Sequence, residues 1–148
     1  MTIEAFLNKH IADWNVLYVK LRHYHWNVTG KQFFTLHTKF EELYSEAAVH
    51  VDELAERLLA LGRRPVSTMT GYLELASIRE ATGNESAADM VQAVAGDYTR
   101  MITGLKQGME IAASAGDETT GDLLLAIRTS LEKQVWMMNA FLGNESLA

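Results

Sequence analysis

Four long stretches of the chain carry apolar side chains at intervals of three and four residues. This spacing places the apolar residues on one face of an α-helix, with polar residues on the other face. The pattern predicts helices over residues 2–27, 33–61, 86–115 and 117–143, and a short helix from Tyr72 to Arg79. Glycines separate the stretches, the chain has a single proline, and runs of β-branched residues are few. We therefore expect an all-α fold.

The lengths of the connections predict how these helices follow one another. The first two helices are joined by a short turn centred near Lys31, so they form an antiparallel hairpin. The segment Arg63–Glu85 is too long for a simple turn, but it can run back along a whole helix. The third helix would then start at the far end and lie parallel to the second. This arrangement is a ferritin-like four-helix bundle with a short extra helix in the crossover between helices 2 and 3.

Four potential metal ligands lie on the second predicted helix: His37, Glu41, Asp52 and Glu56. Each successive pair is spaced i, i+4, so its two members are neighbours on the helix surface. With about 100° of rotation per residue, all four fall within a sector of about 100° and share one face. The same spacing is common on solvated helix faces that bind nothing, and this alternative stays open.

The two pairs are too far apart to hold one ion, because His37 and Asp52 are separated by about 22 Å along the helix axis. Their positions are palindromic, however, about a point between residues 46 and 47. In a second copy laid antiparallel across the first, His37 would meet Glu56 and Glu41 would meet Asp52. A two-fold interface is isologous, so two identical sites would form together. The spacing therefore suggests a metal site shared between subunits.

A third ligand comes from the first helix. His25 lies six residues before Lys31 and His37 lies six residues after it, so the two imidazoles should face each other across the hairpin. His25 would complete a site of two imidazoles and three carboxylates, counting the partner chain. The alternative for a histidine beside Trp26 is a packed, hydrogen-bonded core residue. The other histidines carry no comparable argument: His10, His23 and His50.

Composition narrows the class of protein. The 148 residues suit one domain spanning the whole chain, and 48% hydrophobic with 22% charged residues is typical of a soluble globular protein. With no cysteine, any metal must be held by histidine and carboxylates. The chain lacks a membrane-length apolar run and a signal-peptide pattern, which is compatible with the cytoplasm. There is also no Glu-x-x-His motif, which disfavours a di-iron centre inside one four-helix core.

A cluster of acidic residues opens the last helix: Asp117, Glu118 and Asp122. Acidic residues in a first helical turn are expected from the helix macrodipole alone. As a functional alternative, symmetry copies of these residues would line a negative pore that admits cations.

The residues singled out above carry a resemblance to a known family. The run His25-Trp26-Asn27-Val28-Thr29-Gly30, the pairs Leu36-His37 and Phe40-Glu41, and the run Asp52 to Arg57 resemble the Dps miniferritins. The resemblance spans nearly the whole chain. It implies a ferritin-like subunit that assembles as a hollow dodecamer and stores ferric mineral in its cavity.

The resemblance also implies the chemistry. It implies ferroxidase centres at two-fold interfaces, each binding two irons and oxidising Fe(II), preferably with hydrogen peroxide and with O2 as the alternative oxidant. It also implies protection of DNA from oxidative damage. The ligands it implies are His25, His37 and Glu41 from one subunit, and Asp52 and Glu56 from the neighbour. The family often has Asp at the position of Glu41. Trp26 and Trp136 match aromatic residues that absorb stray oxidising equivalents, and packing is the alternative role for both.

Two other classes of function compete with the ferroxidase. The first is a protein that binds and compacts DNA, with secondary iron binding. Members that bind DNA commonly use tails rich in Lys and Arg, whereas the first thirteen residues here hold only Lys9 and the last fifteen hold no Lys or Arg. With a net charge of −6, we expect weak or absent DNA binding, which a gel-shift assay tests. The second is a structural helical assembly in which these ligands are incidental.

Overall fold

The computed structural model describes residues 1–144, so the last four residues of the tail lie outside the description. Five α-helices and no strand are found in this part of the chain: α1 (Ile3–Asn27), α2 (Phe33–Ala60), α3 (Met69–Leu75), α4 (Ala87–Ser114) and α5 (Glu118–Leu142). The chain divides into two compact units, Met1–Ala87 and Ala88–Ala148. The expectation of an all-α chain with four long helices is confirmed.

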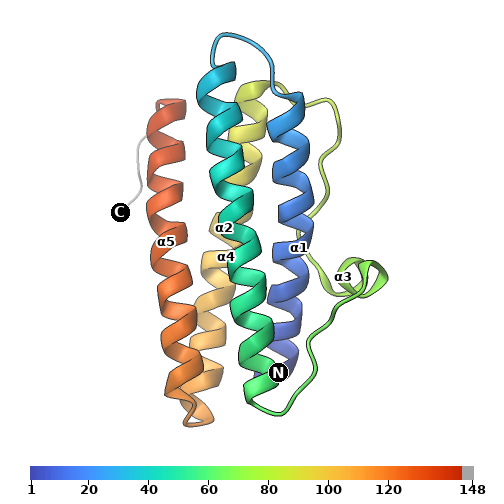
Figure 1. Ribbon diagram of the computed structural model, residues 1–148. Coiled ribbons are helices and arrows are strands. Elements are labelled where there is room, and N and C mark those ends of the chain that lie inside the picture. The colour runs from blue at the N-terminus through green and yellow to red at the C-terminus, as the bar shows by residue number, and fades with distance from the viewer. Residues whose placement is uncertain (145–148) are drawn as a thin grey trace. The chain divides into compact units, whose positions relative to one another are not determined.

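The first unit is built on the α1–α2 hairpin, whose helices run side by side in opposite directions (Figure 1). Helix α1 starts after Thr2, whose side chain accepts a hydrogen bond from the amide of Ala5 at 3.1 Å. It ends before Gly30, whose φ of 107° lies in the left-handed region that favours glycine. The turn then leads directly into α2 at Phe33. These limits agree with the predicted hairpin to within one residue.

The crossover after α2 runs back along α1, anchored to it by polar side chains of that helix. Asn8 donates to the carbonyl of Arg64 and accepts from the amide of Val66. Further along α1, Lys20 Nζ donates to the carbonyl of Arg79 at 2.8 Å. The crossover therefore advances in the same direction as α1.

A further hydrogen bond joins the crossover to α1 just before α4 begins. Tyr24, near the end of α1, donates to Glu85 Oε2 at 2.5 Å. Residue 85, two positions before the first residue of α4, is therefore held beside the end of α1.

The predicted limits of the short crossover helix, Tyr72 to Arg79, are wrong. Helix α3 begins earlier, at Met69, because the side chain of Thr68 caps it by accepting from the amide of Gly71 at 3.1 Å. Gly71 lies inside the helix, where an added Cβ would stand 2.6 Å from Val66 Cγ2. The helix ends at Leu75 because the buried carboxylate of Asp13, on α1, accepts hydrogen bonds from backbone amides that follow the helix.

Asp13 Oδ1 accepts from the amides of Ser77 and Ile78 at 2.8 and 3.1 Å. Its other oxygen, Oδ2, accepts from Lys9 Nζ at 2.8 Å, and the same ammonium donates to Ser77 Oγ at 2.6 Å. These bonds hold residues 77 and 78 in a non-helical conformation against α1.

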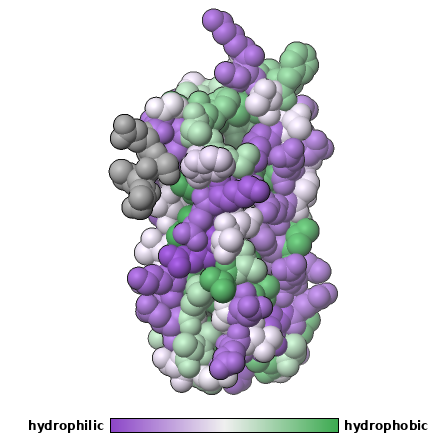
Figure 2. All heavy atoms as spheres, turned by 90° about the vertical axis from the view of Figure 1, so that its left-hand side faces the viewer, coloured by the Kyte–Doolittle hydropathy of each residue, from purple (hydrophilic) through white to green (hydrophobic). Residues whose placement is uncertain are grey.

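The second unit contains α4 and α5, with α5 returning along α4 (Figure 1). Helix α4 begins at Ala87, one residue after the predicted start at residue 86. Its predicted apolar stripe is buried at six positions: Met90, Val91, Val94, Tyr98, Met101 and Leu105. Helix α5 carries exposed apolar residues, among them Leu125, Trp136 and Phe141. Figure 2, which looks toward the side of α5, shows apolar surface interrupted by polar surface. No helix in residues 1–144 is both long enough and apolar enough to cross a membrane.

Candidate metal centre

The two predicted imidazole ligands lie against each other across the α1–α2 hairpin. The rings of His25 and His37 are stacked, with centroids 3.8 Å apart and planes inclined by 12°. His25 is buried, whereas His37 is partly exposed. The pairing that the sequence predicted from the turn centre is confirmed.

Reciprocal hydrogen bonds fix the two imidazoles. Nδ1 of His25 lies 2.6 Å from the carbonyl oxygen of His37, and Nδ1 of His37 lies 2.7 Å from the carbonyl oxygen of His25. A carbonyl oxygen only accepts, so each Nδ1 carries the proton and donates. In the neutral imidazole with its proton on Nδ1, the lone pair lies on Nε2, and this is the form in which histidine binds a metal. The hairpin backbone thus prepares both rings as ligands.

Aromatic rings surround this histidine pair. Phe33 stacks on the outer side of His37 with centroids 4.9 Å apart, and Tyr44 meets His25 edge-on at 5.4 Å. Behind Tyr44, the ring of Tyr18 makes a further edge contact at 5.7 Å. The imidazoles are therefore held by packing as well as by hydrogen bonds. A metal would bind rings that are already ordered.

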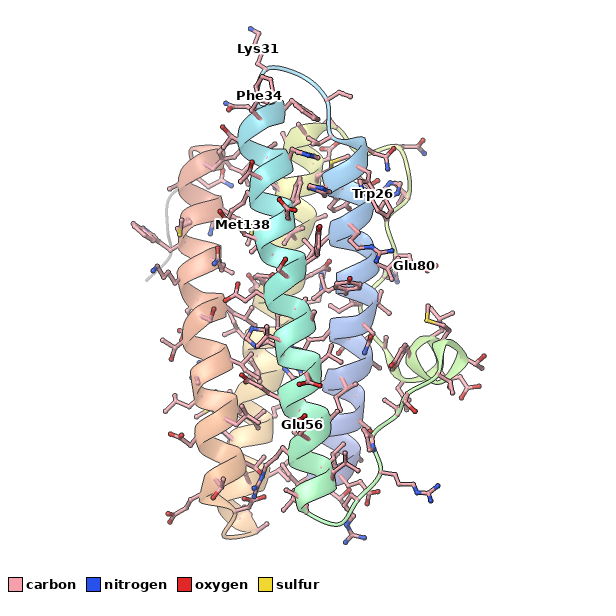
Figure 3. The ribbon with its side chains drawn as sticks, viewed as in Figure 1. Trp26, Lys31, Phe34, Glu56, Glu80 and Met138 are labelled. Atoms are coloured by element: carbon pink, nitrogen blue, oxygen red, sulfur yellow. The ribbon has the colours of Figure 1, made fainter. Side chains whose placement is uncertain are left out.

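The three predicted carboxylate ligands lie on the exposed surface of α2: Glu41, Asp52 and Glu56. Within residues 1–144, none of them takes part in an ion pair. Figure 3 shows Glu56 toward the opposite end of α2 from Phe34 and from the turn that carries Lys31. In the described part of one chain, no three His, Asp or Glu residues are close enough to hold an ion. The structure brings the two histidines together and leaves the carboxylates apart.

Apolar side chains are also exposed on the acidic face of α2. Val49 and Leu59 are each more than half exposed, and helical rotation places both close to the sector that carries the carboxylates. Sequence reasoning did not single them out, although the same count of about 100° per residue would have found them. An exposed face that combines carboxylates with apolar residues has the composition of a protein–protein interface.

Trp26, which the resemblance singled out, directly follows His25 and lies near the end of α1 that leads into the hairpin turn (Figure 3). It is 64% exposed, and the guanidinium carbon of Arg22 stands 5.0 Å from its ring centroid. The same guanidinium lies 5.0 Å from the ring of Tyr18. Trp136, in the second unit, is exposed on α5.

The predicted pore residues stand at the start of α5. Asp117 caps the helix, with Oδ1 accepting from the amide of Thr120 at 3.0 Å and Oδ2 from its hydroxyl at 2.5 Å. Asp117 therefore has a local structural role as the N-cap of α5. Glu118 and Asp122 are exposed. Their role in a pore stays a prediction.

Sequence reasoning also passed over two buried histidines of the first unit. His10 accepts a hydrogen bond from Trp14 Nε1 at 3.1 Å, and the ring of His50 packs against the same indole, with centroids 4.7 Å apart. Burial lowers the pKa of His10 to about 3, helped by the charges of His50 and Lys9. Burial also lowers the pKa of His50, against the opposing effect of Glu46 and Glu53. Both are therefore neutral core residues at pH 7.

Comparison with known proteins gives one consistent result. A family model described as "Ferritin-like domain" matches residues 4–148. The chain is 59% identical to DNA protection during starvation protein 2 of Bacillus anthracis, over 93% of this chain and 94% of that protein. It is 58% identical to General stress protein 20U of Bacillus subtilis, over the same shares of the two chains.

Comparison with solved structures identifies the same family as the sequence comparison. A crystal structure of a Dps protein from Bacillus brevis superposes with a TM-score of 0.94 at 54% identity, covering 95% of this chain and 94% of that one. The fold is therefore the ferritin-like four-helix bundle with an extra short helix, as the sequence predicted. The chain belongs to the Dps family of ferritin-like miniferritins.

Proposed function

We propose that this protein is a ferroxidase that detoxifies and stores iron, with Fe(II) as its substrate. The observation that carries the proposal is the pair of reciprocal hydrogen bonds that leaves Nε2 of His25 and of His37 free. Two imidazoles with carboxylate oxygens suit ferrous iron, and the anionic oxygens favour the ferric product. The family and its relatives named for DNA protection during starvation support the same role.

The proposed centre lies at a two-fold interface between copies of this single domain. His25, His37 and Glu41 of one subunit would bind iron together with Asp52 and Glu56 of its neighbour. The exposure of all three carboxylates in a single chain supports this arrangement, because ligands in a finished site would be enclosed. Exposed apolar residues nearby, Val49 and Leu59 among them, would be covered by the second copy.

The reaction needs two electrons for each hydrogen peroxide molecule. Two ferrous ions at one centre supply one electron each, and with two protons the peroxide becomes two water molecules. Because both electrons arrive together, no hydroxyl radical is released, and DNA nearby is protected without being bound. We propose that the resulting ferric ions collect as mineral inside a hollow cytoplasmic dodecamer. Its acidic pores, lined by Asp117, Glu118 and Asp122, would concentrate Fe(II) at their mouths.

Complementation between two variants tests the shared site. One variant, His25→Ala/His37→Ala, lacks the imidazoles, and the other, Asp52→Ala/Glu56→Ala, lacks the partner's carboxylates. Each assembly alone should lose peroxide-dependent Fe(II) oxidation. In an assembly coexpressed from equal amounts of both, half of the two-fold pairs are mixed and each mixed pair has one intact centre. Activity should therefore return to about a quarter of wild type.

The control removes two other exposed carboxylates from the same helix, Glu42→Ala/Glu53→Ala, and should oxidise iron at the wild-type rate. A mixed assembly as inactive as its parents would exclude a centre shared between chains. Full activity in the His25→Ala/His37→Ala variant would remove the ferroxidase proposal altogether. Size-exclusion mass measured on every sample shows whether the assembly itself is preserved.

A further inference from the structure

A cavity of about 320 Å³ lies between α1 and the crossover helix α3, within the first unit. Small-molecule sites in proteins occupy about 300–1,000 Å³ and are mostly apolar, with a few polar groups that orient the ligand. Apolar and aromatic side chains make up most of the walls of this cavity: Val16, Tyr18, Val19, Met69, Tyr72 and Leu73. None of the seven residues of α3 is buried, so the wall that this helix forms is open to a ligand.

Arg22 of α1 brings a permanent positive charge to the cavity lining. Its Nη1 donates to the hydroxyl of Tyr18 over 3.3 Å, whereas its Nε is enclosed and has no hydrogen-bond partner within residues 1–144. No carboxylate is paired with this guanidinium in that part of the chain. An enclosed donor without a partner is costly, and a carboxylate offers two acceptors that match the guanidinium fork. The lining therefore favours a ligand that carries a carboxylate.

Two further features of the lining restrict the rest of the ligand. Tyr18 and Tyr72 are both partly buried and present aromatic rings, which pack well against another ring. Glu80, an exposed residue of the crossover, also lines the cavity and lies between Trp26 and α3 in the view of Figure 3. Its negative charge repels a second anionic group on the ligand. A flat, apolar body with a single carboxylate fits these surroundings.

We propose that the cavity between α1 and α3 binds a small aromatic monocarboxylate, with its carboxylate on Arg22 and its ring between the apolar side chains of the two helices. None of the ligands proposed for the metal centre lines this cavity, so the inference does not rest on iron oxidation. The alternative is that a second copy of the chain covers the cavity. Exposed apolar residues alone would suit either occupant, whereas a hollow lined by an unpaired guanidinium donor needs an occupant that enters it with an acceptor.

Binding is measured on the iron-free, full-length assembly with two probes of similar shape, 2-naphthoate and its neutral counterpart 2-naphthalenemethanol. Equilibrium dialysis in dilute buffer counts the molecules bound per subunit. We expect 2-naphthoate to saturate at about one per subunit, because the cavity has room for one ligand of this size. The alcohol lacks the charge and should bind about tenfold more weakly, as expected for the loss of a hydrogen bond between charged groups. This comparison needs no substitution.

Two pairs of variants test where the probe binds. Arg22→Gln should weaken 2-naphthoate binding about tenfold and leave that of the alcohol unchanged. Arg79→Gln, which changes an exposed arginine outside the lining, should alter neither. Val19→Trp should block both probes by filling the cavity, whereas Leu75→Trp should block neither. Val19 and Leu75 are both 43% exposed, but of the two only Val19 lines the cavity.

The proposal is overturned if the wild type binds neither probe saturably, which is the result expected if a second copy closes the cavity. Equal affinities for the acid and the alcohol would also overturn it, as would undiminished 2-naphthoate binding in Arg22→Gln or in Val19→Trp. Circular dichroism and size-exclusion mass show whether each variant is folded and assembled before its binding is compared. If a variant does not fold, the comparison of the two probes on the wild type still decides.

Discussion

Removing the carboxylate of Asp13 should destabilise the protein by releasing the crossover from α1. Asp13 is buried, and in Asp13→Ala the amides of Ser77 and Ile78 lose their acceptor together with the ion pair to Lys9. Ile78 is buried, so its unpaired amide costs about 1–3 kcal/mol, whereas the amide of Ser77 can be partly rehydrated and costs about 1 kcal/mol. The partly exposed ion pair adds less than about 1 kcal/mol. The total is about 3 kcal/mol.

Asp13→Asn separates the two effects. Its amide oxygen can still accept from both backbone amides, but its NH2 group faces the Lys9 ammonium as a second donor. We expect a loss of about 1 kcal/mol for Asn and about 3 kcal/mol for Ala. The larger value corresponds to a fall in melting temperature of about 6–12 °C.

Thermal unfolding is compared at one protein concentration, because assembly itself contributes to apparent stability. Glu74→Ala, an exposed acidic position on α3, serves as the control and should change little. Equal losses for Asn and Ala would show that the backbone hydrogen bonds are not what holds the crossover. An unchanged melting temperature for Asp13→Ala would refute the reasoning entirely.

Two further predictions concern stability. The folded pKa of His10, about 3, lies below its ordinary value of 6.5, so the unfolded chain binds more protons between these pH values and stability falls as the pH decreases through that window. His10→Gln, which keeps an acceptor for Trp14, should reduce that slope between pH 6.5 and 4.5 by at most about 1.4 kcal/mol per pH unit, measured by denaturant titration; an unchanged slope would contradict the assignment. Gly62→Ala should destabilise by about 1 kcal/mol because φ is +75° there, whereas Gly104→Ala, inside α4 with no atom within 4 Å of the added Cβ, should stabilise by about 0.5–1 kcal/mol. Thermal unfolding of this matched pair would refute the conformational argument if both changes had the same sign.

The long helices were predictable because amphipathic periodicity and the separating glycines act locally. Glycines such as Gly30 and Gly62 have positive φ at the helix exits where the pattern placed them. The short crossover helix was misplaced for the opposite reason. Its end is decided by Asp13, more than sixty residues earlier in the chain, and no local pattern records that contact. Burial of His10 and His50 was missed because a histidine counts as a polar residue when the sequence is considered alone, although both side chains are buried.

The histidine pair was predictable from the antiparallel geometry of the hairpin. Residues at equal distances on either side of Lys31 face each other, which pairs His25 with His37. The same rule pairs Tyr18 with Tyr44, each thirteen residues from Lys31, and the structure brings these rings together. The signal for the tyrosines was therefore present in the sequence. The orientation of the imidazoles was not, because it depends on backbone carbonyls that only the folded turn brings within reach.

The rest of the proposed centre depends on a second chain, and electrostatics indicates how iron binding and subunit pairing would be coupled. The exposed face of α2 carries Glu41, Asp52 and Glu56 without a cation paired to them in residues 1–144. Two such faces brought together repel each other until a positive ion lies between them. In the proposed two-fold interface, Fe(II) would relieve this repulsion while the two histidines are already in place. Iron binding and subunit pairing would then stabilise each other by the same free energy, as linkage requires.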